Sequence, residues 1–185
     1  MAGKLTEVRW HGRGGQGIKT ACMLLAEAAY MGGKFAQGFA DFGPERTGAP
    51  VRGFTRVDDV PITLHCFIAN PDIVIIVDDT LIEMGGLTDG LKPGGVVLVN
   101  TCKSKSEMAK LLGLPEKQVH VIDATGISID ALGRAVPNAP MMAAFIKLTG
   151  MVELGAAKDT LAHKFSGKVL EGNYKAMDRA FAEVV

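Results

Sequence analysis

Apolar and polar positions alternate along the chain in short blocks, as is typical of a protein with strands and helices in layers. Short apolar runs predict strands. The run Ile73–Val77 contains only β-branched residues, as expected for a strand covered on both faces. Predicted strands lie at residues 7–10, 35–41, 73–77, 96–99 and 119–122. Apolar residues at helical spacing predict helices at 16–31, 104–113, 140–149, 154–163 and 168–184.

One part of the pattern departs from regular alternation of strands and helices. Residues 51–57 and 62–67 both read as strands, with a turn at Asp58-Asp59 and no helix between them. Because a connection this short joins antiparallel strands, we expect a hairpin beside the parallel strands. The sequence thus predicts an α/β, Rossmann-like fold: a mostly parallel open sheet with an antiparallel hairpin excursion and C-terminal helices. The absence of repeats and polar linkers favours a single domain over residues 1–185.

A glycine-rich segment follows the first predicted strand and opens the first predicted helix. Its residues are Gly12, Arg13, Gly14, Gly15, Gln16 and Gly17, which contain the spacing G-x-G-x-x-G. Glycine lets backbone N–H groups approach a ligand closely, and a helix start carries partial positive charge. The segment therefore predicts a phosphate or carboxylate site. The alternative is a tight turn that binds nothing.

The surroundings of this segment argue against an ordinary dinucleotide site. Such a site usually has an acidic residue about 20 positions further on, where it binds the ribose. That position falls near Gln37, and the nearest carboxylate belongs to Asp41. We therefore do not expect NAD to be the ligand.

Polar residues also end the central predicted strands, at Asp78-Asp79, Asn100-Thr101 and Asp123-Ala124-Thr125. Ligands of open α/β sheets bind beyond the carboxyl ends of the strands. These side chains would therefore join the glycine segment in a site, or they would cap the helices that follow. We favour capping, and we predict no catalytic residue among them.

A second unusual segment runs from Gly43 to Pro50, with Pro44, Glu45, Arg46 and Thr47 at its centre. Its prolines and glycines exclude regular structure, and connections of this kind are often functional. A guanidinium at position 46 can donate two parallel hydrogen bonds to a phosphate or a carboxylate. The alternative is a surface ion pair of Glu45 with a neighbouring base.

Composition excludes several classes of partner. The 20 basic residues balance the 20 acidic ones, so we expect no nucleic acid or anionic membrane as partner. No apolar segment approaches the length of a membrane span, and we expect a cytoplasmic protein. The three cysteines and four histidines are scattered, so we predict no metal site and no iron–sulfur cluster on this chain.

Taken together, residues 12–17 and 42–51 resemble the gamma subunits of the 2-oxoacid:ferredoxin oxidoreductases, with pyruvate as the favoured 2-oxoacid. Residues 34–39, 52–57 and 138–141 fit the same pattern, and the resemblance spans nearly the whole chain. It implies a multisubunit enzyme, a pyruvate synthase of anaerobic metabolism. Such an enzyme converts pyruvate, coenzyme A and oxidised ferredoxin into acetyl-CoA, carbon dioxide and reduced ferredoxin.

The resemblance also implies how the work is divided among subunits. Thiamine diphosphate and the 4Fe-4S clusters would lie on partner subunits, and this chain would contribute assembly and the positioning of coenzyme A. Arg13–Gly17 would form the anion-binding turn, and Pro44–Thr47 a loop at the subunit interface or the mouth of the active site. Lys19 and Arg46 would add phosphate contacts.

Two alternatives stay open from the sequence. One is a free-standing NAD(P)-dependent reductase, and the other is a scaffold subunit without a ligand. The 48% apolar content further predicts an exposed apolar patch and self-association of the chain when it is expressed alone.

Overall fold

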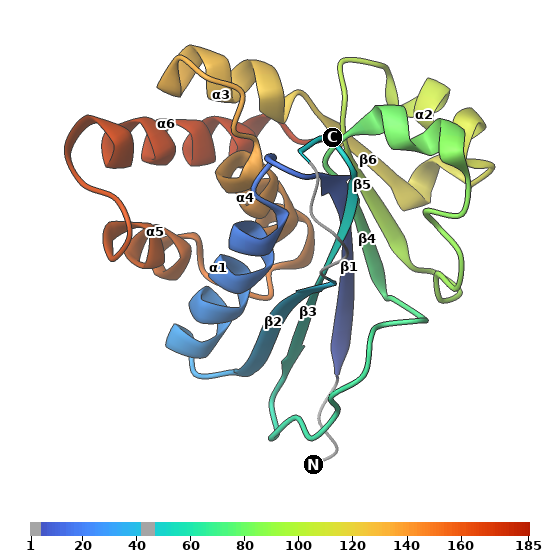
Figure 1. The fold of residues 1–185 in the computed structure, drawn as a ribbon, viewed down its shortest axis with the longest axis horizontal. Helices are drawn as coiled ribbons and strands as arrows, with labels where there is room; N and C mark the ends of the chain where they lie inside the picture. Colours follow the sequence, from blue (N-terminus) through green and yellow to red (C-terminus); the bar gives the residue numbers. More distant parts are fainter. Residues whose placement is uncertain (1–4, 42–46) are drawn as a thin grey trace.

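The computed structural model describes residues 5–41 and 47–185. Within them one mixed sheet of six strands runs in the order β2-β3-β1-β4-β5-β6 (Figure 1). The strands are β1 (Thr6–Arg13), β2 (Phe35–Asp41), β3 (Pro50–Asp58), β4 (Ile73–Ile76), β5 (Val96–Asn100) and β6 (Val119–Ile122). Strands β1, β4, β5 and β6 are parallel, whereas β3 is antiparallel to both β1 and β2. The predicted fold class is thus confirmed.

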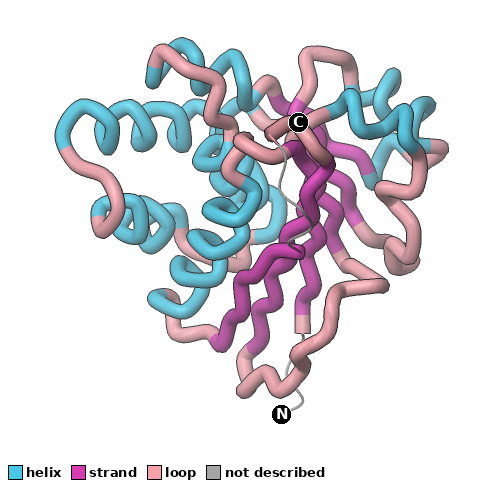
Figure 2. Tube along the Cα trace, viewed as in Figure 1, coloured by secondary structure: helices cyan, strands magenta, loops and turns pink. Residues whose placement is uncertain are grey.

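Most helices gather on one side of the sheet, as Figure 2 shows. The α-helices are α1 (Ile18–Met31), α2 (Lys105–Leu112), α3 (Ala124–Leu132), α4 (Asn138–Thr149), α5 (Leu154–Ala162) and α6 (Gly167–Glu183), with 3-10 turns η1 (Asp79–Met84) and η2 (Glu116–Gln118). The larger core joins Trp10, Leu25 and Phe145 on the side of α1 and α4. A smaller core on the opposite face packs Met108 of α2 against Val97.

The predicted hairpin of residues 51–57 with residues 62–67 is wrong; an antiparallel pair is present, but it joins β3 to β2. Residues 62–67 form no strand, and the antiparallel partner of β3 is β2, paired without interruption from Phe35↔Asp58 to Asp41↔Arg52. The other edge of β3 is paired with β1, so no edge of β3 is left for residues 62–67. That segment instead crosses the outer face of the sheet, where the amide of Gln37 donates to the carbonyl of Ile62 at 3.3 Å.

Helix α1 lies unusually close to β2. A Cβ atom added to Gly38 would lie 2.5 Å from the carbonyl oxygen of Cys22 and 2.8 Å from the Cα atom of Met23. The thiol of Cys22 is buried here and donates to the carbonyls of Lys19 and Phe39. The absence of a side chain at Gly38 therefore sets the height of α1 above the sheet, and with it the position of the helix start.

A buried arginine on β1 fastens two irregular segments to the opposite face. Arg9 donates to the carbonyls of Ala69, Leu87 and Asp89 over 2.6–3.1 Å, and its Nε donates to Nε2 of His11 at 3.1 Å. Residues 69 and 87–89 belong to segments without helix or strand, and among the described residues no helix covers this part of the sheet face. The hydrogen bonds of Arg9 therefore hold these segments against the sheet.

Candidate functional site

The glycine segment forms a turn between β1 and α1, at the carboxyl ends of the parallel strands. Gly17 precedes α1 with a left-handed backbone, φ 77°, which favours glycine. A Cβ atom at Gly12 would lie 2.3 Å from Cδ1 of the buried Ile18. Both glycines are therefore required by the turn itself. We call residues 12–17 the glycine turn.

The two variable residues of the glycine turn are bound within the chain. The backbone N–H of Arg13 donates to Oε1 of Gln16 at 2.7 Å, and Nε2 of Gln16 donates to Oδ2 of Asp78 at 2.7 Å. The Arg13 guanidinium lies 3.3 Å from the same carboxylate oxygen and donates to Oγ1 of Thr80 at 2.8 Å. Arg13 and Gln16 thus join the glycine turn to the end of β4.

Asp78 is the centre of this network. Its partial burial opposes ionisation, but hydrogen bonds from Thr80 and Gln16, together with the charge of Arg13, outweigh burial and lower the pKa of the carboxyl below its ordinary value. Asp78 therefore stays a carboxylate at neutral pH, as an acceptor for three neighbours requires.

The second predicted segment, Gly43–Pro50, contacts the glycine turn through residues 48 and 49, which belong to its described part. The N–H of Gly14 donates to the carbonyl of Ala49 at 2.8 Å, and the N–H of Gly48 donates to the carbonyl of Gly14 at 3.0 Å. Arg13 adds a bond of 3.1 Å to the carbonyl of Gly48. Thr47 lies exposed beside this contact. The other predicted residues, Pro44, Glu45 and Arg46, lie outside the described residues.

A cleft of about 360 Å³ lies beside Gln16, where the parallel strands end. We call it the strand-end cleft; its lining is Gln16, Val77, Asp78, Asp79, Asn100, Thr101, Cys102, Lys103, Asp123 and Thr125. Three carboxylates face one lysine in this lining, so the cleft has an acidic character. Among the described residues no three His, Cys, Asp or Glu side chains are grouped as metal ligands.

Most polar groups of the strand-end cleft serve the elements that follow the strands. Oδ1 of Asp123 accepts from the N–H of Gly126 at the start of α3 (2.7 Å), and Oδ1 of Asp78 accepts from the N–H of Thr80 in η1 (3.1 Å). Asn100 donates to the hydroxyl of Thr125 at 2.8 Å. The prediction of capping is confirmed for Asp78 and Asp123, whereas α2 is capped by Ser104 and not by Asn100 or Thr101.

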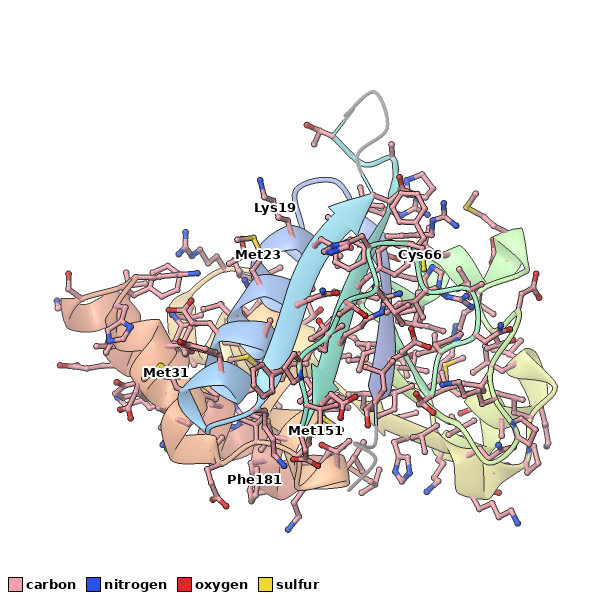
Figure 3. The ribbon with its side chains drawn as sticks, turned by 90° about the horizontal axis from the view of Figure 1, so that it is seen from below. Lys19, Met23, Met31, Cys66, Met151 and Phe181 are labelled. Atoms are coloured by element: carbon pink, nitrogen blue, oxygen red, sulfur yellow. The ribbon has the colours of Figure 1, made fainter. Side chains whose placement is uncertain are left out.

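The start of α1 has a different character. The residue before it, Gly17, has no side chain that could cap the helix, and the first turn of α1 contains no acidic residue. Lys19 lies exposed in that first turn, at the end of α1 nearest the glycine turn (Figure 3). The helix start therefore keeps the partial positive charge that attracts anions.

Two residues of this region were missed as site residues in the sequence. Thr80 binds both Asp78 and Arg13. Asn138, at the start of α4, is buried, and its amide nitrogen would lie 3.0 Å from a Cβ atom at Gly17. Asn138 could have been found through the similarity at residues 138–141, whereas Thr80 carries no signal in one sequence.

Comparison with known proteins gives the relationship directly. The family model for pyruvate ferredoxin/flavodoxin oxidoreductase matches residues 7–183. The common gamma subunit of the pyruvate and ketoisovalerate oxidoreductases of Thermococcus kodakarensis is 44% identical, over 98% of this chain and 98% of its own length. The crystal structure of pyruvate oxidoreductase subunit PORC from Thermotoga maritima is 38% identical, over 98% of each chain, with a TM-score of 0.88.

The fold also occurs within a larger chain. The 2-oxoglutarate:ferredoxin oxidoreductase of Magnetococcus marinus was solved with 2-oxoglutarate, coenzyme A and succinyl-CoA bound. It matches 97% of this chain and 31% of its own, with 21% identity and a TM-score of 0.78, so this likeness concerns the fold. The predicted resemblance is confirmed by the family model and the closer relatives. The chain belongs to the pyruvate ferredoxin/flavodoxin oxidoreductase family.

Proposed function

We propose that this chain is the gamma subunit of a multisubunit pyruvate:ferredoxin oxidoreductase and that the start of α1 holds the phosphates of coenzyme A. The names of the relatives support the first part, since they are gamma or PORC subunits that this chain matches end to end. The uncapped helix start beside the glycine turn supports the second part, and is the observation that carries it.

Charge decides which part of the site takes the phosphates. The strand-end cleft contains Asp78, Asp79 and Asp123; Arg13 and Lys103 pair with the first two, and the remaining negative charge repels an anion. Lys19 and the N–H groups of the first turn of α1 attract one. The phosphates therefore belong at the helix start, outside the acidic cleft. Arg13 and Gln16, already bound to Asp78, hold the turn in shape and are not direct phosphate contacts in this arrangement.

The chain's own contribution is binding and orientation. When bound elsewhere in the complex, thiamine diphosphate supplies the carbanion chemistry, and iron–sulfur clusters carry the electrons. We propose that both lie on partner subunits and that no residue here acts as acid, base or nucleophile. The helix start would fix the anionic end of coenzyme A, so that its thiol reaches the active site from a constant direction.

A charge reversal with a matched control tests the phosphate site. Lys19 and Lys168 are both exposed and both second residues of helices, α1 and α6. In the reconstituted complex, Lys19→Glu should raise the KM for coenzyme A by about tenfold, equivalent to about 1.4 kcal/mol, with kcat at saturation unchanged. Lys168→Glu should change neither constant. Because an acid in the first turn stabilises a helix, neither variant should unfold the chain.

The result separates this proposal from a scaffold role. One observation favours the scaffold alternative: Arg13 and Gln16 are already bound to Asp78 within the chain, so they are not available to a ligand. An unchanged KM in Lys19→Glu, with normal assembly of the complex, would leave the gamma-subunit role standing and remove the ligand role. Failure of the tagged chain to copurify with coenzyme-A-dependent, pyruvate-driven viologen reduction would remove both.

A further inference from the structure

The two edge strands of the sheet, β6 and β2, differ in whether their outer backbone groups are hydrogen-bonded. At β6 the backbone of Val185 exchanges two hydrogen bonds with Val121, over 3.0 and 3.3 Å, so that edge is occupied. At the opposite edge lies β2, and among the described residues no strand lies beyond it. Its seven residues contain no proline, no lysine and no bulge, and their single charge is Asp41 at the end. A regular, nearly uncharged edge of this kind is a template for another strand.

Exposed apolar side chains flank this edge on both faces of the sheet. On the helical side, Met23, Tyr30 and Met31 of α1 are 41%, 70% and 44% exposed, and on the outer face Phe35 of β2 is 43% exposed. Figure 3 shows Met23 and Met31 on α1 beside β2. The edge and these side chains together, which we call the β2 edge surface, combine unpaired backbone groups with an apolar patch, the combination found where a strand is added from another molecule.

The sequence of β2 fits a second copy of itself. We consider an antiparallel pair of two β2 strands related by a two-fold axis at Gln37. Phe35 of each copy then lies opposite Phe39 of the other, which gives two aromatic pairs on the outer face of the sheet. On the inner face Ala36 lies opposite Gly38, which leaves only small side chains under the helices. Aromatic pairs opposite one another stabilise adjacent strands. Phe39 already belongs to an aromatic group on that face, with its ring 5.2 Å from Phe54.

The helices fit the same symmetry. Helix α1 packs over both β2 and β3, so its axis lies about one strand spacing, roughly 5 Å, from the two-fold axis. The α1 helices of two copies would then lie roughly 10 Å apart, which is the spacing of packed helices. The Cα atom of Met23 would lie only 2.8 Å from a Cβ atom at Gly38, one residue from the axis, and the Met23 side chain is 41% exposed, so the two Met23 side chains would meet close to the axis.

We propose that the β2 edge surface joins two copies of this chain, by antiparallel pairing of β2 with β2 and packing of α1 against α1. The result is one continuous sheet across both copies. This contact does not involve the glycine turn, and it forms without coenzyme A.

Three substitutions to lysine test the proposal by sedimentation velocity on the full chain. Met23→Lys places like charges near the axis, and Phe35→Lys removes an aromatic pair and protects the edge. Each should weaken association by at least about tenfold. Leu111→Lys is the matched control: Leu111 is 57% exposed on α2, away from β2, and its substitution should leave association unchanged. Circular dichroism confirms that each variant is folded.

Hydrogen exchange locates the contact independently of the variants. In the wild-type chain, amides of residues 35–41 should become more protected as concentration rises, with no such change at residues 119–122. Wild-type chain that remains a 19.5 kDa monomer at its highest soluble concentration would overturn the proposal. Association that leaves exchange at β2 unchanged would also overturn it. Protection of β2 only after partner subunits are added would assign the edge to a partner instead of a copy.

Discussion

At the scale of single residues, the site depends on a few positions where one atom more or a different charge would not fit. Gly17 supplies a left-handed backbone before α1, and Gly38 lets that helix approach β2. Asp78 then binds the glycine turn through Gln16 and Arg13. None of these residues needs to touch a ligand, yet together they fix where the N–H groups of α1 point.

The close approach at Gly38 predicts a large cost for one methyl group. Gly38→Ala would place Cβ 2.5 Å from a backbone carbonyl, which cannot move without moving α1. We expect a loss of about 1–3 kcal/mol in the free energy of unfolding. Gly155→Ala is the control, because nothing lies within 4 Å of its added Cβ and the position is helical, so stability should stay equal or rise. Urea unfolding measures both, and equal stability of the two variants would contradict the packing argument.

His11 predicts a specific dependence of stability on pH. Burial, reinforced by the charges of Arg9 and Arg52, lowers the pKa of His11 from 6.5 to about 4. In the unfolded chain His11 takes up a proton near pH 6.5, whereas in the folded chain it stays neutral down to about pH 4. Protons therefore favour the unfolded state between these values. Stability should fall by about 3 kcal/mol from this residue as the pH drops through that window.

A variant isolates the contribution of His11. His11→Gln keeps an acceptor for Arg9 but does not titrate. Its free energy of unfolding, measured in urea at pH 7 and pH 5, should change less between the two values than that of the wild type. Parallel pH profiles for both proteins would show that His11 is accessible to protons in the folded state.

At the scale of elements, the sequence predicts the helices and strands that depend on interactions between residues close together in the chain. Strand β2 and helices α1 and α4–α6 follow from apolar spacing and from glycines at their ends, and residues 35–41 form the strand as predicted. The strand expected at 62–67 is absent because pairing is decided by long-range competition, in which β1 and β2 occupy both edges of β3. Helix α3 was missed because Asp123–Gly126 reads as a loop, although Asp123 caps that helix.

In the candidate site, too, the local features could be predicted from the sequence and the long-range contacts could not. The glycine turn is visible in the sequence because its backbone conformation demands glycine. The bond between Gln16 and Asp78 joins residues 62 positions apart, and only the parallel register of β1 and β4 brings them together. No pattern in one sequence reports such a register.

The irregular segments on the outer face depend on Arg9. Arg9→Met removes the donors to the carbonyls of Ala69, Leu87 and Asp89 while keeping much of the side-chain volume. We expect a loss of about 2–4 kcal/mol and faster proteolysis within residues 60–72 and 85–91. Cleavage sites found by mass spectrometry check this. A variant that resists protease as the wild type does would show that these segments are held mainly by other contacts.

At the scale of the whole molecule, the fold separates an anion-attracting helix start from an acidic strand-end cleft and from the β2 edge surface. The proposed ligand and the proposed second copy would therefore contact different parts of the molecule. Within the described residues no helix is long and apolar enough to cross a membrane. The relatives are enzyme subunits, and the end-to-end match to them extends the same architecture to this chain.

The buried thiol of Cys22 under α1 can report when this helix separates from the sheet. Cys66 and Cys102 are exposed, whereas Cys22 is buried beneath the helix, and burial raises its pKa to about 11. Since the thiolate is the reactive form and the reagent must reach the sulfur, a maleimide should label the two exposed thiols first, with Cys102 slowed by the charge of Asp123, which raises its pKa, and should label Cys22 only when α1 leaves the sheet. The slow phase then gives the rate at which α1 leaves the sheet, and so the opening rate of the proposed coenzyme A site, without a ligand, a dye or an engineered probe. Three equally fast thiols would mean that α1 lifts from β2 on the timescale of labelling.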